Sequence, residues 1–231
     1  PLIVACALFM ENLDSTVLAT ALPAIAADFG ENPIHLKLAL TAYLLSVAVF
    51  LPVSGWLSDR FGARIVFRAA IVLFGIGSIM CAFSGSISAI VVGRIVQGIG
   101  GSLMVPVGRL IIVRSVPKSE IIGSMAWLTI PALVGPLAGP LVGGFITTYY
   151  DWRWIFWINI PIGVLGLVLA TLYIPDLHGE QRPAFDFVGF LLAGIGLACF
   201  VTGATTIGLG VSGAARGGAA ADVTRAETKP A

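Results

Sequence analysis

The chain consists of long apolar segments separated by short polar ones. Each apolar segment is about twenty residues long and almost free of charge, which is the length that an α-helix needs to cross a bilayer. Backbone groups inside a bilayer must be hydrogen-bonded internally, and helices satisfy this requirement for runs of this kind. We therefore predict an all-α polytopic membrane protein with about seven transmembrane helices, at Leu2–Ala24, Leu36–Leu57, Ile65–Phe83, Ile87–Val107, Ile121–Thr147, Ile155–Tyr173 and Phe187–Leu209.

The composition supports this class of protein. Hydrophobic residues make up 58% of the chain and charged residues 11%, whereas soluble domains carry about 25% charged residues. The formal net charge of +1 gives no reason to expect a nucleic-acid surface. The 3 cysteines are scattered over separate apolar runs, which favours small buried side chains over a disulfide framework or a metal site. No nucleophile–base pair or phosphate loop is present, so we expect neither an enzyme activity nor a cofactor.

Basic residues in the connecting segments predict the orientation. The connections after the second, fourth and sixth runs hold Arg60, Arg64, Arg68, Arg109, Arg114, Lys118 and Arg182, and the others hold only Lys37 and Arg153. Lys and Arg are enriched on the cytoplasmic side of membrane proteins. We therefore expect a multi-pass protein of the cell (inner) membrane with its N-terminus in the cytoplasm.

The order of the runs predicts how the chain is divided. The first six runs form two triplets that start on opposite sides, which is the arrangement of inverted repeats in transporters. We expect a six-span bundle at residues 1–175, a cytoplasmic linker at 176–186 and a seventh span at 187–209. Residues 210–231 are rich in Ala and Gly and lack an apolar period, so we expect a disordered tail.

A charged motif, G-W-L-S-D-R-F-G-A-R, joins the second and third apolar runs. We expect a short turn in which Gly62 lets the backbone reverse and Asp59 caps the following helix. The pattern G-x-L-x-D-R-x-G-x-R at this place resembles the signature of the major facilitator superfamily, although a tight hairpin with an arginine anchor would explain it too. The resemblance implies a cytoplasmic gating loop with Gly55, Asp59, Arg60, Gly62 and Arg64.

The first and fourth runs carry charges inside the expected membrane span. Glu11 and Asp14 share a helix face, and burial favours the neutral form of a carboxyl group, so the pair is a candidate proton site. A permanent polar contact between helices is the alternative. Arg94 keeps its proton and needs an acceptor, and its depth differs from that of Asp14 by roughly 5 Å. This difference predicts an ion pair, although an arginine near a boundary can also extend toward the headgroups.

The arginine belongs to R-x-x-Q-G-x-G, which resembles the fourth-span motif of the same superfamily. The resemblance implies that the first and fourth spans line a central cavity. It also implies that protonation of Asp14 drives alternating access. Together with the positions of the charges in the two spans, this gives Asp14, Arg94 and Glu11 as the expected proton-coupling residues. The polar side chains expected in the substrate cavity are Asn12, Thr16 and Gln97.

Glycine and proline recur at helical spacing in the fifth run. Three glycines four residues apart form one smooth face on which another helix can pack closely, and two prolines remove backbone hydrogen bonds and bend the helix. The pattern G-P-x-x-G-P-x-x-G-G resembles the antiporter signature of the superfamily, and close packing alone would also explain it. The residues of this expected seam are Gly135, Pro136, Gly139, Pro140, Gly143 and Gly144.

Further motifs narrow the resemblance. W-R-W-I-F-W-I-N-I-P and F-D-F-V-G-F, together with L-D-S-T and A-L-P in the first run, are similar to the fourteen-span drug:proton antiporter branch, although Ala19 stands where many members carry Asn. The resemblance implies the N-terminal half of an exporter that uses protons to move drug-like amphipathic molecules by alternating access. Its partners would be the substrate, protons, membrane lipid and the missing C-terminal half. The alternatives are a metabolite or sugar symporter and a truncated or frame-disrupted fragment that does not transport.

Overall fold

The computed structural model describes residues 2–175 and 185–203, and every regular element in them is helical. The expectation of an all-α protein is confirmed. Most of the expected linker and the whole expected tail lie outside the described residues. In chain order the elements are α1 (Leu2–Phe29), α2 (Pro33–Phe50), α3 (Val53–Phe61), α4 (Ala63–Ala82), α5 (Ile87–Ser115), the short 3-10 helix η1 (Lys118–Glu120), α6 (Ile121–Tyr149), α7 (Trp154–Trp157), α8 (Asn159–Tyr173) and a further helix at Phe187–Gly203.

The helices agree with most of the expected spans. In the described part of the chain, 5 helices are long and apolar enough to cross a membrane, or up to 6 if the bent pair α2–α3 forms one span. Helix α5 continues to Ser115, past its expected end at Val107. The expected seventh span is a shorter apolar helix, and residues 204–209 lie outside the described part.

The charged motif is helical where a turn was expected. Helix α2 ends before Pro52, which cannot continue its hydrogen bonding, and α3 follows at an angle of 56°. The reversal is confined to Gly62, whose φ of 89° is a conformation that favours glycine. Asp59 lies within α3 and does not cap α4, since Gly62 occupies that position with no side-chain hydrogen bond. The expected cap is therefore wrong.

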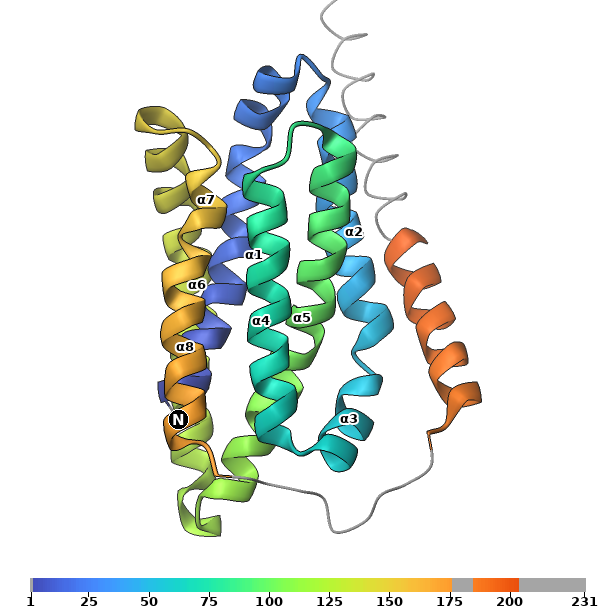
Figure 1. The fold of residues 1–231 in the computed structure, drawn as a ribbon, viewed down its shortest axis with the longest axis vertical. Coiled ribbons are helices and arrows are strands. Elements are labelled where there is room, and N and C mark those ends of the chain that lie inside the picture. The colour runs from blue at the N-terminus through green and yellow to red at the C-terminus, as the bar shows by residue number, and fades with distance from the viewer. Residues whose placement is uncertain (1, 176–184, 204–231) are drawn as a thin grey trace, which may run out of the picture.

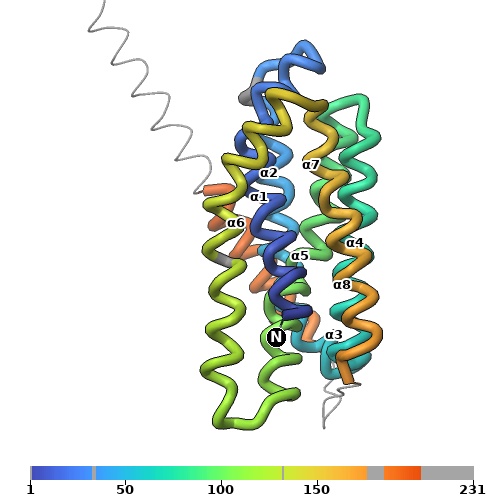
Figure 2. The backbone as a smooth tube through the Cα atoms, turned by 90° about the vertical axis from the view of Figure 1, so that its left-hand side faces the viewer, coloured from blue at the N-terminus to red at the C-terminus, as the bar shows by residue number. Residues whose placement is uncertain are grey.

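The helices run along the long axis of the molecule and reverse direction from one span to the next. Figure 1 shows the N-terminus, the α3–α4 turn, the α5–α6 connection and the end of α8 at one end of the bundle. The α1–α2, α4–α5 and α6–α7 connections lie at the opposite end, and Figure 2 shows the same division from the side. The basic connections expected in the cytoplasm therefore share one end of the bundle.

Helix contacts relate the two triplets as inverted repeats would. The first triplet is α1, α2–α3 and α4, and the second is α5, α6 and α7–α8. The first helix of each triplet packs against the second helix of the other, which gives the pairs α1–α6 and α2–α5. The first helix of each also contacts the third of the other, in the pairs α4–α5 and α1–α8. Exchange of the two triplets preserves all four pairs, as a two-fold axis requires.

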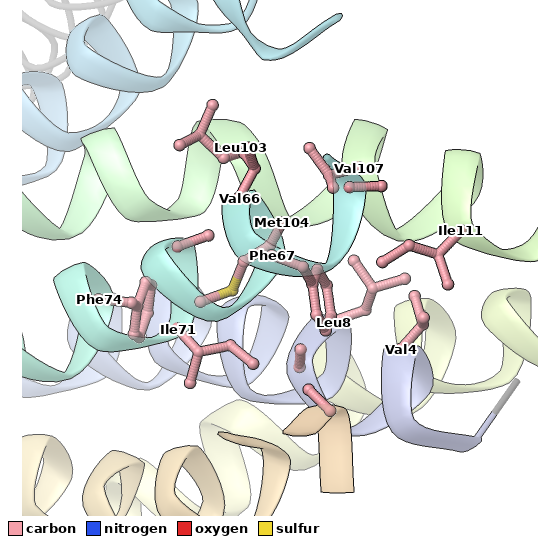
Figure 3. Packing of buried hydrophobic residues seen from close by; sticks show 14 of the residues in the cluster. Val4, Leu8, Val66, Phe67, Ile71, Phe74, Leu103, Met104, Val107 and Ile111 are labelled. Carbon is pink, nitrogen blue, oxygen red and sulfur yellow. The ribbon is translucent and has the colours of Figure 1, made fainter. Parts of the chain in front are cut away.

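Apolar side chains fill the interior and also cover much of the outside. Figure 3 shows Val4 and Leu8 of α1 among residues of α4 and α5, including Phe67 and Met104. The outer surface of α6 is as apolar as the interior, since it carries large exposed hydrophobic residues such as Leu141, which is 77% exposed. Because lipid is as apolar as these side chains, helix association in such a protein depends on close packing and polar contacts.

Candidate functional site

Five buried polar side chains meet in the middle of the bundle. They come from four helices and are at most 1% exposed: Asp14 of α1, Ser78 of α4, Arg94 and Gln97 of α5, and Asn159 of α8. Polar groups buried at this depth are stable only when they are paired. The set therefore forms one polar centre, called the central network below.

An ion pair between Asp14 and Arg94 forms the core of the central network. The Arg94 guanidinium donates from Nη1 to the Asp14 carboxylate at Oδ2 and to Gln97 Oε1 at 2.8 Å. The other carboxylate oxygen, Oδ1, accepts from Asn159 at 2.7 Å and from Gln97 at 3.3 Å. The ion pair predicted from the depths of the two residues is confirmed, and it joins the first helices of the two triplets.

Gln97 lies elsewhere than expected. It was assigned to the substrate cavity, but its side chain is fully buried and donates to Ser78 at 2.7 Å as well as to Asp14. Asn159 was missed as a functional candidate, although it donates to both Asp14 and Ser78. A lone carboxamide inside an apolar run is costly unless it is paired, and this was the signal available in the sequence.

Glu11 lies beside the central network and contacts it through Tyr43 of α2. Its Oε1 accepts a long hydrogen bond of 3.5 Å from the Tyr43 hydroxyl, and its buried Oε2 has no hydrogen-bond partner among the described residues. The Tyr43 ring lies against the Arg94 guanidinium, with 4.5 Å from the guanidinium carbon to the ring centroid. Tyr43 therefore contacts Glu11 with its hydroxyl and Arg94 with its ring.

Asn12 and Thr16, the other expected cavity residues, face α6 instead of the central network. Asn12 lines a cavity of about 510 Å³ between α1, α5 and α6, together with Arg109 and Thr129. Thr16 hydrogen-bonds to its own helix and, at 3.4 Å, to the carbonyl oxygen of Gly135. The six expected proton-coupling and cavity residues therefore lie in two adjoining regions. One is the central network with Glu11 beside it, and the other is the side of α1 that faces α6, which has both apolar and polar side chains.

The residues of the charged motif tie the ends of several helices together. Asp59 accepts from Arg114 of α5 at 2.9 Å, and Arg64 donates to the carbonyl oxygen of Thr171 near the end of α8. Arg60 lies over Trp56, at 5.4 Å from its ring centroid. Asp59 therefore has an ion-pair partner within the described part of this chain.

The expected glycine seam of α6 lies directly on α1. A methyl group added at Gly135 would meet Asn12 at 2.7 Å, and methyl groups at Gly139 and Gly143 would clash with Thr16 and Thr20. Gly144 has nothing within 4 Å and faces away. Three of the four glycines in the motif therefore allow the two helices to approach closely, as small residues do in membranes.

Gly139→Ala is expected to destabilise the bundle, because the new methyl group overlaps with Thr16 and the helices must separate. Overpacking of this kind typically costs about 1–3 kcal/mol. Gly144→Ala is the matched control in the same helix and should be neutral or stabilising by up to about 1 kcal/mol, since alanine favours helices. Thermal unfolding of the purified chain in detergent measures both. An equal loss of stability in both variants would contradict close packing as the role of the seam.

Among the described residues, no group of three or more His, Cys, Asp and Glu could hold a metal ion. The central network contains groups that can bind a proton and form ion pairs. One carboxylate lies there against an arginine and two carboxamides, with a second carboxyl group beside it.

Comparisons with known proteins place the chain in a family. It is 45% identical over 225 residues to the "Putative multidrug resistance protein MdtD" of Salmonella paratyphi B, which covers 95% of this chain and 48% of that protein. The chain thus spans about half the length of the curated relatives it matches.

Two solved structures share its fold at low sequence identity. The xylose transporter XylE from E. coli, partially occluded and inward open, matches with a TM-score of 0.68, 18% identity and coverage of 87% of this chain and 52% of that one. The peptide transporter POT in complex with sulfate matches with a TM-score of 0.68, 19% identity and coverage of 91% and 45%. The family profile described as Major Facilitator Superfamily matches residues 4–185, and the chain therefore belongs to the major facilitator superfamily.

Proposed function

We propose that this chain forms the N-terminal half of a proton-coupled exporter of small amphipathic molecules in the cell membrane. The observation that carries the proposal is the fully buried ion pair between Asp14 and Arg94, which joins the first helices of the two triplets. A charge buried in a membrane protein is costly, and such charges are usually functional. A second half would complete the transport path, and relatives that carry the name of a multidrug resistance protein support the export direction.

Protonation of Asp14 is the proposed coupling step. The carboxylate holds α1 against α5 through Arg94, and against α4 and α8 through Gln97, Ser78 and Asn159. Adding a proton to Asp14 removes its charge and weakens the attraction to Arg94. The two triplets could then shift relative to each other, which is the movement that alternating access requires. Release of the proton on the other side of the membrane would restore the pair.

The proposed substrate path lies on the α1, α5 and α6 side of the bundle. The cavity of about 510 Å³ there has a size typical of small-molecule sites. Its lining is mostly apolar with a few polar groups, which suits amphipathic molecules. The lining residues are Leu8, Asn12, Val105, Arg109, Met125, Leu128 and Thr129.

The proposal can be tested with this chain joined to the C-terminal half of an MdtD relative. Everted vesicles from a host without its own exporters would take up ethidium, an amphipathic cationic dye, when a pH gradient is imposed. Collapse of the gradient by a protonophore should stop the uptake. If the gradient instead drives xylose in the same direction as protons and leaves the dye unmoved, the chain belongs to a symporter and the proposal is wrong.

We also propose that the N-terminus is cytoplasmic, because the end of the bundle with α3 and η1 carries most of the basic residues. Ser86 and Ser119 are exposed and lie near opposite ends. With Cys6 and Cys199 replaced by serine, an impermeant maleimide added to intact cells should label Ser86→Cys and leave Ser119→Cys unlabelled. Ser84→Cys, at a buried site beside Ser86, is the control that should stay unlabelled. Equal labelling of Ser86→Cys and Ser119→Cys from outside would contradict the orientation.

A further inference from the structure

Two carboxyl groups and one cation lie together at the centre of the bundle. Asp14 and Glu11 are three residues apart on one face of α1, where side chains are typically about 5–6 Å apart. Arg94 forms the ion pair with Asp14, and in the described part of the chain no cation forms an ion pair with Glu11. The charges therefore balance only if one of the two carboxyl groups carries a proton.

The contacts of Asp14 identify it as the ionised group. Among the described residues, every partner of its carboxylate is a donor: the Arg94 guanidinium at Oδ2, and the carboxamides of Asn159 and Gln97 at Oδ1. Gln97 presents its amide nitrogen to Asp14 because its oxygen already accepts from Arg94. A protonated carboxyl group would place a donor against this set of donors. The central network thus stabilises Asp14 as an anion.

The contacts of Glu11 are those of a neutral acid. Its only hydrogen bond among the described residues is the long one from Tyr43, and its second oxygen is buried without a partner. An ionised carboxylate in such a place loses its hydration and gains almost nothing in return, which is far more costly than the same burial of the neutral form. The titratable and charged groups that face this centre from the neighbouring helices are Tyr43 of α2, Cys81 of α4 and Arg94 of α5.

Tyr43 connects the two sites. Its hydroxyl contacts Glu11 and its ring supports Arg94, whose Nε and Nη2 have no hydrogen-bond partner among the described residues. The guanidinium thus has two donor groups to offer to a second carboxylate. Removal of the negative charge from Asp14 would leave Arg94 with Tyr43 and, beyond it, Glu11.

We propose that Glu11 is a second protonation site and that Glu11 and Asp14 hold one proton between them, with Arg94 paired to whichever carboxyl group is ionised. Tyr43 is the positioning residue that links the two sites. This inference rests on the proposed function, in which Asp14 takes up a proton from water on one side of the membrane. When Asp14 gains that proton and releases Arg94, Glu11 loses its own proton to water on the other side of the membrane and becomes the new partner of the arginine. Passage of the proton from Asp14 to Glu11 then restores the first pair, so one proton crosses the membrane in each cycle. Asp14, Glu11 and Arg94 together then have no net charge in either state. The triplets can therefore shift without leaving an unpaired charge inside the membrane.

The pair can be tested without transport by infrared spectroscopy of the purified full chain in lipid bilayers. The carbonyl stretching band of a protonated carboxyl group is expected at neutral pH, and Glu11→Gln should remove it. Asp14→Asn should also remove most of the band, because Arg94 is then free to pair with Glu11 and ionise it. A merely structural Glu11 would keep its band in that variant. Glu120→Gln, at an exposed glutamate, is the control and should leave the band unchanged.

Tyr43→Phe keeps the test decisive if Asp14→Asn does not fold. This variant retains the ring beneath Arg94 and loses only the hydroxyl, so the Glu11 band should remain and move to higher frequency. The inference is overturned if Glu11→Gln removes no band, if Asp14→Asn folds and leaves the band intact, or if Tyr43→Phe leaves its frequency unchanged. The infrared readout does not depend on transport. A failure of the vesicle assay would therefore overturn the proposed function alone, whereas the infrared outcomes test only the proton shared by Glu11 and Asp14.

Discussion

Asp14→Asn is expected to abolish export driven by an imposed pH gradient in everted vesicles, with this chain joined to the C-terminal half of an MdtD relative. Asparagine is nearly isosteric with aspartate and can still hydrogen-bond within the central network, but it cannot take up or release a proton in the working range of pH. Dye binding should stay within about threefold of the parent protein, since the cavity lined by Asn12 and Arg109 lies beside the central network and keeps its shape.

Two further variants define what this result means. Asp151→Asn removes an exposed carboxylate at the opposite end of the bundle from α3 and should export at the parent rate. Glu11→Gln should reduce export less than Asp14→Asn, because Asp14 still binds a proton and only the exchange of Arg94 is lost. Full gradient-driven export by Asp14→Asn would show that the proton binds elsewhere, and Glu11 would then be the first candidate.

Much of the architecture could be predicted because a bilayer leaves the backbone few options. The apolar runs had the length of spans, and the expected helices agree with α1, α4, α5, α6 and α8. The Asp14–Arg94 pair was predictable for a related reason. The rise of a helix converts residue number into depth, and two opposite charges at similar depth in a medium without water attract each other strongly.

The partners that complete the site could not be found in this way. Ser78 and Asn159 reach the central network only because α4 and α8 pack beside α1 and α5. Tyr43 depends likewise on the rotation of α2 about its axis. These rotations are set by packing between helices, and span length and charge contain no information about them.

The turn predicted from the residue types of the charged motif was also wrong. Its glycines and charges suggested a loop, but residues between Pro52 and Gly62 can form a helix, and the tertiary pair between Asp59 and Arg114 stabilises one there. Helix propensity is a weak preference that such contacts override. Only the positive φ at Gly62 followed from the residue type itself.

Arg94→Met is expected to cause the largest loss of stability of any single change considered. Methionine approximates the length of the side chain and retains contact with Tyr43, but it leaves the Asp14 carboxylate buried without a cation. Removing one partner of a buried pair typically costs about 3–5 kcal/mol. The free energy of unfolding of the purified chain in detergent measures the loss. Arg114→Met is the matched control, because it breaks the half-exposed pair with Asp59 and should cost less than about 1 kcal/mol.

A double variant separates the charge from the shape of the side chain. Adding Asp14→Asn to Arg94→Met removes the unpaired carboxylate, and the amides of Gln97 and Asn159 can rotate to bond the new asparagine. At least half of the lost stability should return, because replacing both partners of a buried ion pair is often close to neutral. If the double variant is as unstable as Arg94→Met, the loss comes from packing around the arginine, and the ion pair does not account for the stability of the central network.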